Sequence, residues 1–325
     1  MTDGSRVRSP HHVIFMGSAE LACPGLRALA GDPNFKVLAV VTQPDRPKGR
    51  DLKLSPSPVK ACALEQKLPV LQPERARDEA FIAELRHLAP DIIVVIAYGQ
   101  ILPRAILELP KYGCLNVHTS LLPKYRGATP IQWAILNDEQ QTGVTIMQMD
   151  EGLDTGDLVA AAKTPIAPED DASTLHDRLG RMGAELLVRT IPDYAAGKIT
   201  PEKQPGEGSS YARKIKKEDG QIDWNQPARK IWNMVRAFVP WPVAFTYFGE
   251  KGKPHLLKIW SAAEEPAMSG APGTVLQAAK EGFVVACREG ALRVQSLQRE
   301  GGKRLSAQEF AAGHRIKNLF HLPPV

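Results

Sequence analysis

Residues 91–97 read Asp-Ile-Ile-Val-Val-Ile-Ala, and this run of mostly β-branched side chains ends at Tyr98 and Gly99. Such residues favour extended backbone, so the run predicts a strand that is buried on both faces. Three similar runs predict the other strands of one sheet: Val13–Met16, Val37–Thr42 and Cys114–His118. Helical patterns lie between the runs, over Pro58–Lys67, Asp78–His87 and Pro103–Leu109. Because strands that alternate with helices build a parallel sheet, the first half of the chain is predicted to be an α/β domain.

The carboxyl ends of these strands are where a ligand is expected, because open parallel sheets bind ligands beyond that edge. Gly17, Gly99 and His118 all stand at such strand ends. The turn at Gly17 lacks the G-x-G-x-x-G pattern of a dinucleotide site, so hydride chemistry with a nicotinamide cofactor has little support. A longer helix over Ser173–Ala196, with leucines on one face, is expected to close the domain.

The composition is that of a folded protein. The 325 residues are 43% hydrophobic and 24% charged, which excludes wholesale disorder and a small disulfide-stapled module. No apolar run approaches the roughly 18 to 20 residues of a membrane span, and the N-terminus lacks a signal-peptide core, so we expect a cytoplasmic protein. The four cysteines form no C-x-x-C pair and no cluster with histidines, so we expect neither a disulfide framework nor a metal site.

The second half of the chain differs in charge and in pattern. Residues 1–199 carry 22 lysines and arginines against 24 aspartates and glutamates, whereas residues 200–325 carry 19 against 12. Short strand-like runs separated by turns favour a small β-barrel there. The stretch GKITPEKQPGEGSS at 197–210 has the composition of a linker. We therefore expect a first domain over residues 1–197, a linker over 198–212 and a second domain over 213–325.

Asn116 and His118 end the strand that begins at Cys114. Alternate residues of a strand share a face, so the amide and the imidazole are predicted to point in the same direction. An imidazole suits proton transfer near neutral pH, and an amide NH2 can donate to an oxygen on which negative charge develops. Taken alone, the pair is more simply a packed core histidine and a strand-end asparagine.

Two segments change that interpretation. The loop from Ser120 to Gly127 follows His118 directly, and such a turn-rich loop can cover a bound ligand. The acidic run from Asp150 to Asp157 follows another predicted strand, Val144–Met149. One of its carboxylates could accept a hydrogen bond from His118 and orient the ring. The run also fits a solvated turn, but it lacks the ligand spacing of a calcium loop.

The two motifs together resemble the active-site signature of the folate-dependent formyltransferases. Asn116-x-His118-x-Ser120-Leu121-Leu122-Pro123 is followed at a distance by Gly152-Leu153-Asp154-Thr155-Gly156. The likeness is closer to the branch of the family that formylates methionyl initiator tRNA, through Thr42–Arg50, Ser57–Lys60 and Gly143–Asp150. It covers nearly the whole chain and implies a Rossmann-like, parallel-sheet formyltransferase domain followed by a small OB-like β-barrel domain.

The resemblance also implies a role for each motif. Asn116, His118 and Asp154 would be catalytic, with Asn116 and a protonated His118 stabilising an oxyanion on the former formyl carbon and Asp154 holding His118. Ser120, Leu121, Leu122 and Pro123 would contact the co-substrate 10-formyltetrahydrofolate, and no metal is implied. The expected reaction moves the formyl group to the α-amino group of methionyl initiator tRNA, giving N-formylmethionyl-tRNA for translation initiation.

A basic loop follows the second predicted strand. From Asp45 to Lys60 the chain carries five basic residues against two acidic ones, and such a run is by itself a solvated surface loop. The resemblance implies instead that this loop binds the acceptor end of the tRNA. The residues expected to make the contacts are Arg46, Lys48, Arg50 and Lys53. The basic second domain would attract further phosphates.

Two other functions stay open on the sequence. An amino-sugar-nucleotide formyltransferase would share the stretch from His118 to Arg126 but would not need the basic loop. A non-catalytic RNA-binding protein could retain the same fold. We expect a monomer, since no heptad pattern or exposed apolar stripe is evident.

Overall fold

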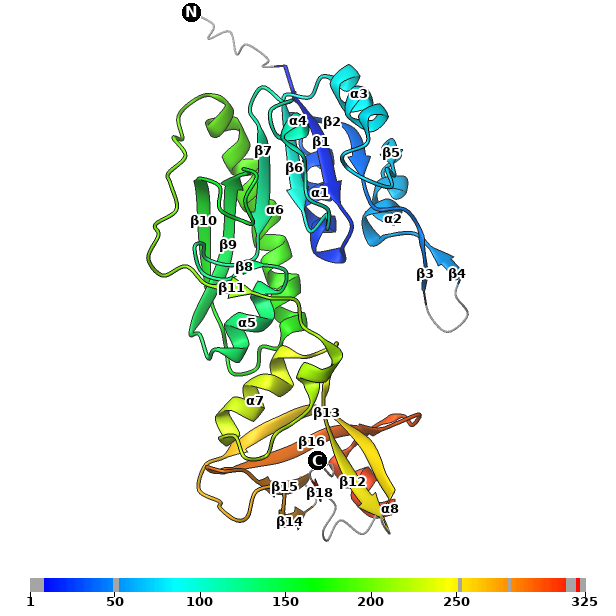
Figure 1. The fold of residues 1–325 in the computed structure, drawn as a ribbon, viewed down its shortest axis with the longest axis vertical. Helices are drawn as coiled ribbons and strands as arrows, with labels where there is room; N and C mark the ends of the chain where they lie inside the picture. Colours follow the sequence, from blue (N-terminus) through cyan, green and yellow to red (C-terminus); the bar gives the residue numbers. More distant parts are fainter. Residues whose placement is uncertain (1–8, 49–52, 251–252, 280–281, 314–319, 322–325) are drawn as a thin grey trace, which may run out of the picture. The chain divides into compact units, whose positions relative to one another are not determined.

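The computed structural model describes residues 9–48, 53–250, 253–279, 282–313 and 320–321 (Figure 1). The chain divides into two units, each assembled from three segments. The N-terminal unit consists of Met1–Pro130, Thr142–Thr164 and His176–Ala212. The C-terminal unit consists of Ile131–Gln141, Pro165–Leu175 and Arg213–Val325.

A seven-stranded sheet forms the N-terminal unit, in the order β10-β9-β7-β6-β1-β2-β5. Its strands are β1 His11–Gly17, β2 Phe35–Val41, β5 Val70–Leu71, β6 Ile92–Ile96, β7 Cys114–His118, β9 Gln141–Gln148 and β10 Leu158–Pro165. The five strands from β7 to β5 run parallel, and β9 pairs antiparallel with β7. The predicted parallel α/β sheet is confirmed, with an antiparallel extension beside β7.

The helices that accompany this sheet begin and end at local signals in the sequence. They are η1 Glu20–Ala22, α1 Cys23–Gly31, α2 Pro58–Glu65, α3 Glu79–Leu88, α4 Arg104–Leu107 and α6 Ala172–Ala195. Pro58 stands in the first turn of α2, and Ser57 Oγ accepts a hydrogen bond from the amide of Lys60. α3 ends where Ala89 takes a left-handed conformation. The four helices predicted in this part of the chain are present, each within two residues of its predicted ends.

Complete burial makes the centre of this sheet rigid. Every residue of β6 is buried, as its run of β-branched residues predicts. Its side chains pack with Ile14 and Met16 of β1 and with Phe81 and Leu85 of α3. Burying a side chain of this size stabilises a fold by about 1.5–3 kcal/mol. The sheet therefore gives a firm base to the loops at its carboxyl edge.

Two short strand pairs lie outside the main sheet. β3 Arg46–Lys48 and β4 Lys53–Ser55 form an antiparallel hairpin, which extends away from the sheet after β2 (Figure 1). β8 Arg126–Gly127 pairs in parallel with β11 Tyr211–Ala212. Within the segment 198–212, Glu202 also exchanges two backbone hydrogen bonds with Leu158, of 2.7 and 2.9 Å. The segment is thus hydrogen-bonded to the rest of the N-terminal unit through Glu202 and through β11, as well as through Gln204, described below.

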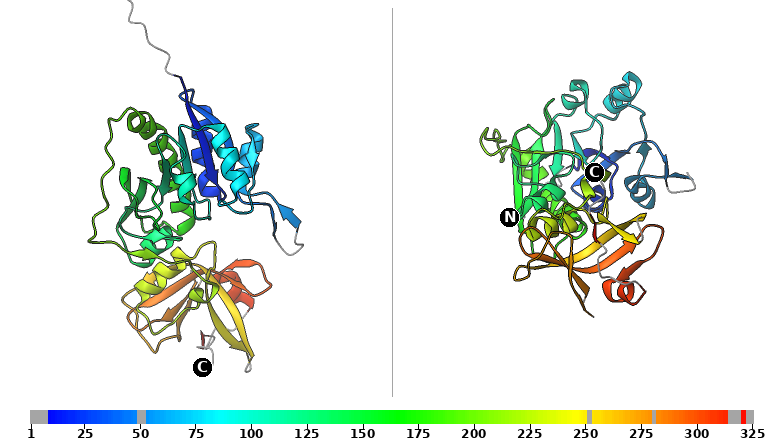
Figure 2. Two further views of the ribbon diagram at one scale, coloured as in Figure 1. Left: turned by 45° about the horizontal axis from the view of Figure 1, so that its top comes forward. Right: turned by 60° about the horizontal axis from the view of Figure 1, so that its bottom comes forward.

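The C-terminal unit is built on an antiparallel sheet, drawn in yellow to red in Figure 2. The strand order is β14-β15-β16-β13-β12-β18, with β17 paired to β16. Its elements are α5 Pro130–Leu136, η2 Lys217–Gly220, α7 Ala228–Ala237, β12 Ala244–Glu250, β13 Lys253–Glu265, β14 Val275–Ala279, β15 Gly282–Ala286, β16 Ala291–Arg299, β17 Arg304–Ser306, α8 Ala307–Gly313 and β18 Phe320–His321. Trp224, Phe248 and Phe283 are fully buried in its core. Shifts of register along β13 allow the sheet to curl. The predicted small barrel is confirmed as a curled antiparallel sheet that forms half a barrel.

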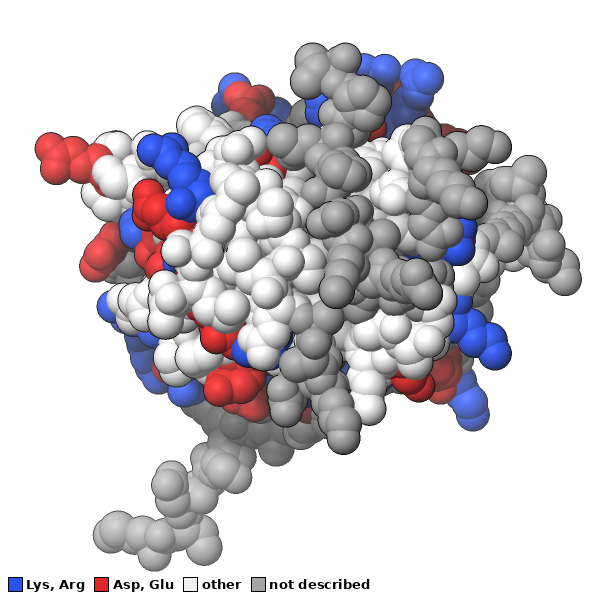
Figure 3. Space-filling model, turned by 90° about the horizontal axis from the view of Figure 1, so that it is seen from below, with Lys and Arg blue, Asp and Glu red and all other residues white. Residues whose placement is uncertain are grey.

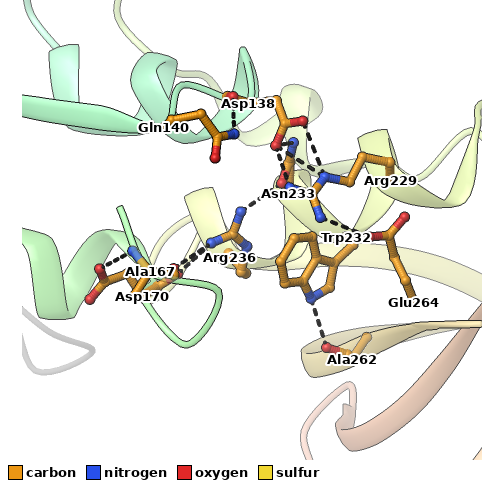
Figure 4. A network of polar contacts seen from close by, with 10 residues as sticks. All are labelled: Asp138, Gln140, Ala167, Asp170, Arg229, Trp232, Asn233, Arg236, Ala262 and Glu264. Carbon is orange, nitrogen blue, oxygen red and sulfur yellow. Dashed lines mark hydrogen bonds and ion pairs between the residues drawn. The ribbon is translucent and has the colours of Figure 1, made fainter. Parts of the chain in front are cut away.

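Two segments that precede the tail in the sequence, Ile131–Gln141 and Pro165–Leu175, belong to the C-terminal unit and bind to α7 (Figure 4). Arg229 forms an ion pair of 2.8 Å with Asp138 and another of 2.9 Å with Glu264 of β13. Asn233 donates a hydrogen bond to the same carboxylate oxygen of Asp138. The hydrogen bond from Arg229 is the main cause that lowers the pKa of Asp138.

Arg236 binds the second segment. Its Nη1 donates to the backbone carbonyls of Ala167 and Asp170, at 3.3 and 3.0 Å (Figure 4). Its guanidinium carbon lies 3.8 Å from the ring centroid of Trp232. Cation–π stacking and carbonyl acceptors compensate in part for the loss of water around this charge, although burial still lowers the pKa of Arg236. Arg229 and Arg236 together hold segments 131–141 and 165–175 against α7.

Candidate active site

The carboxyl end of β7 carries the first two predicted site residues. Asn116 and His118 lie on the same face of the strand, because one residue separates them. The side chain of His118 is only 7% exposed, whereas Asn116 is half-buried. β7 lies between β6 and β9, with Asn116 opposite Val95 on one side and Met147 on the other. The two side chains therefore project from the interior of the sheet.

Asp154 lies beside His118, although the two are 36 positions apart in the sequence. Asp154 Oδ2 is 3.7 Å from His118 Nδ1. The other ring nitrogen, Nε2, is 2.9 Å from the carbonyl oxygen of Tyr125. A carbonyl oxygen can only accept, so Nε2 carries a proton and donates it. This contact fixes the tautomer and leaves Nδ1 facing the carboxylate.

The loop that presents Asp154 is tightly folded. Asp154 has a positive φ of 53°, and its Oδ2 accepts a hydrogen bond of 2.8 Å from the amide of Gly127. Gly156 is needed for close packing, since a Cβ atom there would lie 1.8 Å from the carbonyl oxygen of Gln148. The hydroxyl of Thr155 donates to both carboxylate oxygens of Asp150. Two acidic residues of the run thus have different tasks: Asp150 braces the turn, and Asp154 faces the histidine.

Gln204 is a site residue that the sequence interpretation missed. Its Nε2 donates to the carbonyls of Asp154 and Gly156, both at 2.8 Å. Its Oε1 accepts from Nε and Nη2 of Arg126, at 3.0 and 2.7 Å. One amide therefore connects the loop after β7 to the acidic loop. It lies in the stretch predicted as a linker, where no local pattern marks it.

The predicted folate-contacting residues, Ser120 to Pro123, form the turn directly after β7. Ser120 is fully buried, and its Oγ donates to the carbonyl of Lys124 at 2.6 Å. Thr145 of β9 braces this turn, because its hydroxyl donates to the Ser120 carbonyl and accepts from the Leu122 amide. The peptide bond between Leu122 and Pro123 is cis. Leu122 is buried, while Leu121 and Pro123 are half-buried, so apolar surface from these two is exposed beside the site.

The predicted tRNA-binding residues lie apart from this turn, on the β3–β4 hairpin. Arg46 begins β3 and is exposed, and Lys48 pairs in register with Lys53 across the hairpin. Arg50 lies outside the described residues. The structure thus brings Asn116, His118 and Asp154 together with Ser120–Pro123. It places Arg46, Lys48 and Lys53 on a separate projection of the same unit.

The charge of the described surface is mixed in the view of Figure 3. On that face, lysines and arginines lie near aspartates and glutamates around an uncharged central area, parts of which are covered by residues that are not described. Among the described residues visible in this view, lysines and arginines form no continuous patch.

Burial lowers the reactivity of three cysteine thiols. It raises the pKa of Cys23 to about 11 and those of Cys114 and Cys287 to about 12. All four cysteines are buried and free. A thiol that stays protonated at neutral pH is a poor nucleophile and a poor metal ligand. In the described part of the chain, no three histidine, cysteine, aspartate or glutamate side chains are grouped so as to hold a metal ion.

No helix among the described residues combines the length and the apolar character needed to cross a lipid bilayer.

The fold and the site together define an α/β enzyme with a histidine–carboxylate pair and an adjacent amide at the carboxyl edge of its sheet. The model of the formyl transferase family matches residues 13–191, and the model of the formyl transferase C-terminal domain matches residues 214–315. The chain belongs to the formyl transferase family.

Individual relatives match over almost the whole length. A methionyl-tRNA formyltransferase of Citrifermentans bemidjiense is 50% identical over 305 residues, which are 94% of this chain and 94% of the relative. One of Geobacter sulfurreducens is 49% identical over the same shares. Among solved structures, an N-formyltransferase of Helicobacter canadensis in complex with folinic acid and dTDP-3-aminofucose has a TM-score of 0.62. That pair is 20% identical, with 88% of this chain and 99% of the other covered, so this likeness concerns the fold alone.

Proposed function

We propose that this chain transfers the formyl group of 10-formyltetrahydrofolate to the α-amino group of methionyl initiator tRNA, giving N-formylmethionyl-tRNA for translation initiation. The observation that carries the proposal is identity of about 50% over 94% of the chain to relatives named methionyl-tRNA formyltransferase. The pairing of His118 with Asp154 beside Asn116 agrees with it.

The chemistry starts with attack of the neutral methionyl amine on the formyl carbon. The new C–N bond makes a tetrahedral intermediate whose oxygen is negative. Asn116 donates its amide NH2 to that oxygen, and one such donor is worth about 2.7–4 kcal/mol of barrier. The amine then loses a proton, the bond from the formyl carbon to the folate nitrogen breaks, and that nitrogen takes up a proton. No bond to the enzyme forms at any step.

His118 moves protons between these positions, and Asp154 supports it. The Nδ1–Asp154 distance of 3.7 Å is longer than a hydrogen bond. A proton on Nδ1 can therefore be shared with a water molecule or a substrate oxygen, while the nearby carboxylate stabilises the positive charge on the ring. The backbone carbonyl of Tyr125 keeps Nε2 as a hydrogen-bond donor.

Further parts of the proposal concern binding and organisation. Ser120, Leu121, Leu122 and Pro123 contact the folate, and Arg46, Lys48, Arg50 and Lys53 contact the tRNA. Residues 1–197 form the catalytic domain, 198–212 a connecting segment and 213–325 a tRNA-binding domain. The family models, which end at 191 and restart at 214, support these boundaries. The protein acts as a monomer in the cytoplasm.

The test is incubation with formyl-labelled tetrahydrofolate and three acceptors: methionyl initiator tRNA, methionyl elongator tRNA and an amino-sugar nucleotide. Label on the initiator tRNA alone is expected. Label on the sugar would replace this proposal with the sugar alternative. Binding of tRNA without any transfer of label would favour a non-catalytic RNA-binding protein.

A further inference from the structure

The base of the β3–β4 hairpin contains an ion pair to which the proposed chemistry assigns no task. Lys60 Nζ of α2 lies 2.7 Å from Asp45 Oδ2, and the side chains are 21% and 30% exposed. The other carboxylate oxygen, Oδ1, accepts 2.9 Å from Gln72 Nε2. Gln72, which follows β5, also donates to the carbonyl of Gln43 at 3.0 Å. Both oxygens of Asp45 are therefore held, by groups from two different parts of the chain.

A second contact joins the two ends of the hairpin at its base. The hydroxyl oxygens of Thr42 and Ser57 are 2.6 Å apart, and Ser57 also caps α2. Thr42 precedes the hairpin and Ser57 follows it, so this contact joins its two ends. Thr42 Oγ1 is also 3.3 Å from Ser18 Oγ, beyond the end of β1.

The base of the hairpin is also connected to the end of β6, the strand next to β7. Gln43 Nε2 donates to the carbonyl of Tyr98, 2.9 Å away, and Tyr98 lies just beyond β6. β6 pairs with β7, which carries Asn116 and His118. A continuous set of hydrogen bonds thus runs from the carboxyl edge of the sheet to Asp45.

The hairpin depends on this base for its direction. Its two strands have three residues each and lie outside the main sheet. A lone two-stranded hairpin is marginally stable in water, and it has no further strand to fix its angle. Arg46 follows Asp45 directly, so a rotation at Asp45 would carry the whole hairpin with it.

We infer that Asp45, held by Lys60 and Gln72, is a positioning residue that sets the direction of the hairpin for the acceptor end of the tRNA. This inference rests on the proposed function. Asp45 acts through Arg46 and the residues that follow it and does not touch the reacting groups.

Asp45→Asn distinguishes a positioning role from a simple effect of charge, because the two predict opposite changes in the KM for tRNA. The substitution removes a negative charge beside a basic hairpin, so net charge alone would strengthen the attraction for phosphate and lower the KM for tRNA. Loss of positioning raises that KM. We expect a rise of roughly tenfold, the change that accompanies loss of a charge-assisted hydrogen bond, with kcat within about twofold of wild type.

Matched variants and a short substrate complete the experiment. Lys60→Met should raise the KM for tRNA as Asp45→Asn does, and Lys60→Arg should preserve it. Asp193→Asn on α6, which breaks a 2.8 Å pair between Asp193 and Lys198, gives the same change of net charge and should leave the KM unaltered. The methionyl ester of a CCA trinucleotide carries the reactive amine without an acceptor stem, so its kcat/KM should be the same in wild type and Asp45→Asn.

The outcomes are distinct. An unchanged or lower KM for tRNA in Asp45→Asn overturns the inference, and so does an equal loss on tRNA and trinucleotide, since that would place the defect in the catalytic site. Wild-type protein that formylates neither substrate would refute the proposed function itself. Circular dichroism of each variant checks that the fold is retained.

Discussion

At the scale of single residues, the site depends on His118 having different neighbours at its two nitrogens. The backbone carbonyl of Tyr125 holds Nε2, and the carboxylate of Asp154 faces Nδ1. The contact with the Tyr125 carbonyl fixes the tautomer of the ring but adds no net charge beside it. The contact with Asp154 adds a negative charge. The two can be separated experimentally, because only Asp154 contributes through its side chain.

Asp154→Asn should abolish most of the turnover while leaving the loop intact. An asparagine still accepts from the Gly127 amide and tolerates the positive φ at this position. The charge beside His118 is lost, and general acid–base assistance of this kind is worth about 10²–10⁴ in rate. We expect kcat to fall by that factor with both KM values nearly unchanged, measured by transfer of formyl label. Asp157→Asn, in the same acidic run, is the control, and equal rates for the two variants would contradict the role of Asp154.

Gly156→Ala should disable the same loop by a steric route. The new Cβ would meet the Gln148 carbonyl oxygen at 1.8 Å, and neither backbone can move freely. Overpacking of this type destabilises by about 1–3 kcal/mol. Activity should fall at least tenfold and the melting temperature should drop. Gly206→Ala, whose new Cβ would have no atom within 4 Å, should match wild type in both measurements.

At the scale of elements, the sequence predicts what local patterns determine. β6 and β7 were predictable because their residues are buried on both faces, and α2 because Ser57 and Pro58 mark its start. α1 has Pro24 in its first turn but no side-chain cap, and Gly25 follows directly. A Cβ at Gly25 would stand 2.7 Å from Ile96 Cδ1, so close packing on the sheet accounts for the glycine.

The site shows the same division between local and long-range information. Strand alternation predicts that Asn116 and His118 share a face. The approach of Asp154 to His118 comes from the resemblance to a family, since no spacing rule joins residues 36 positions apart. Gln204 could not be found at all, because its partners lie 48 to 78 residues away and its neighbours have linker composition.

Gln204→Ala tests whether the segment 198–212 takes part in the site. The substitution removes the hydrogen bonds that join Arg126 to the carbonyls of Asp154 and Gly156. We expect kcat to fall roughly tenfold, less than for Asp154→Asn, because loss of one bridging amide leaves the Asp154 carboxylate on the Gly127 amide. Gln226→Ala removes a similar amide, bonded to Asp223 in the C-terminal unit, and serves as the control. Equal activity of the two variants would mean that Gln204 is dispensable.

At the scale of the whole molecule, the stability of the C-terminal unit is expected to respond to acid. Asp138 of the C-terminal unit has a lowered pKa, chiefly through its hydrogen bond from Arg229. A carboxylate whose pKa is lower in the folded state stabilises the fold above the unfolded value of about 4, and this contribution disappears as the pH falls through the folded value.

Asp138→Asn should therefore lower the urea midpoint of unfolding near neutral pH and have no effect in strong acid. The difference from wild type should be largest above about pH 5 and shrink towards pH 3. A partly exposed pair of this kind contributes about 1 kcal/mol or less. Asparagine suits the positive φ of Asp138, so backbone strain does not confuse the result. A difference that persisted unchanged at pH 3 would show that the carboxylate charge is not the cause.

The assembly of the C-terminal unit from three stretches of chain has a consequence for protein engineering. Arg229 and Arg236 recognise loops that are encoded near residues 138 and 167, far upstream of the tail. A chimera made with a single crossover near residue 213 takes its tail from one relative and its upstream loops from another. The two arginines would then contact loops from a different protein. Recombination that moves all three stretches together keeps the native set of partners, and libraries designed in this way should yield more folded hybrids.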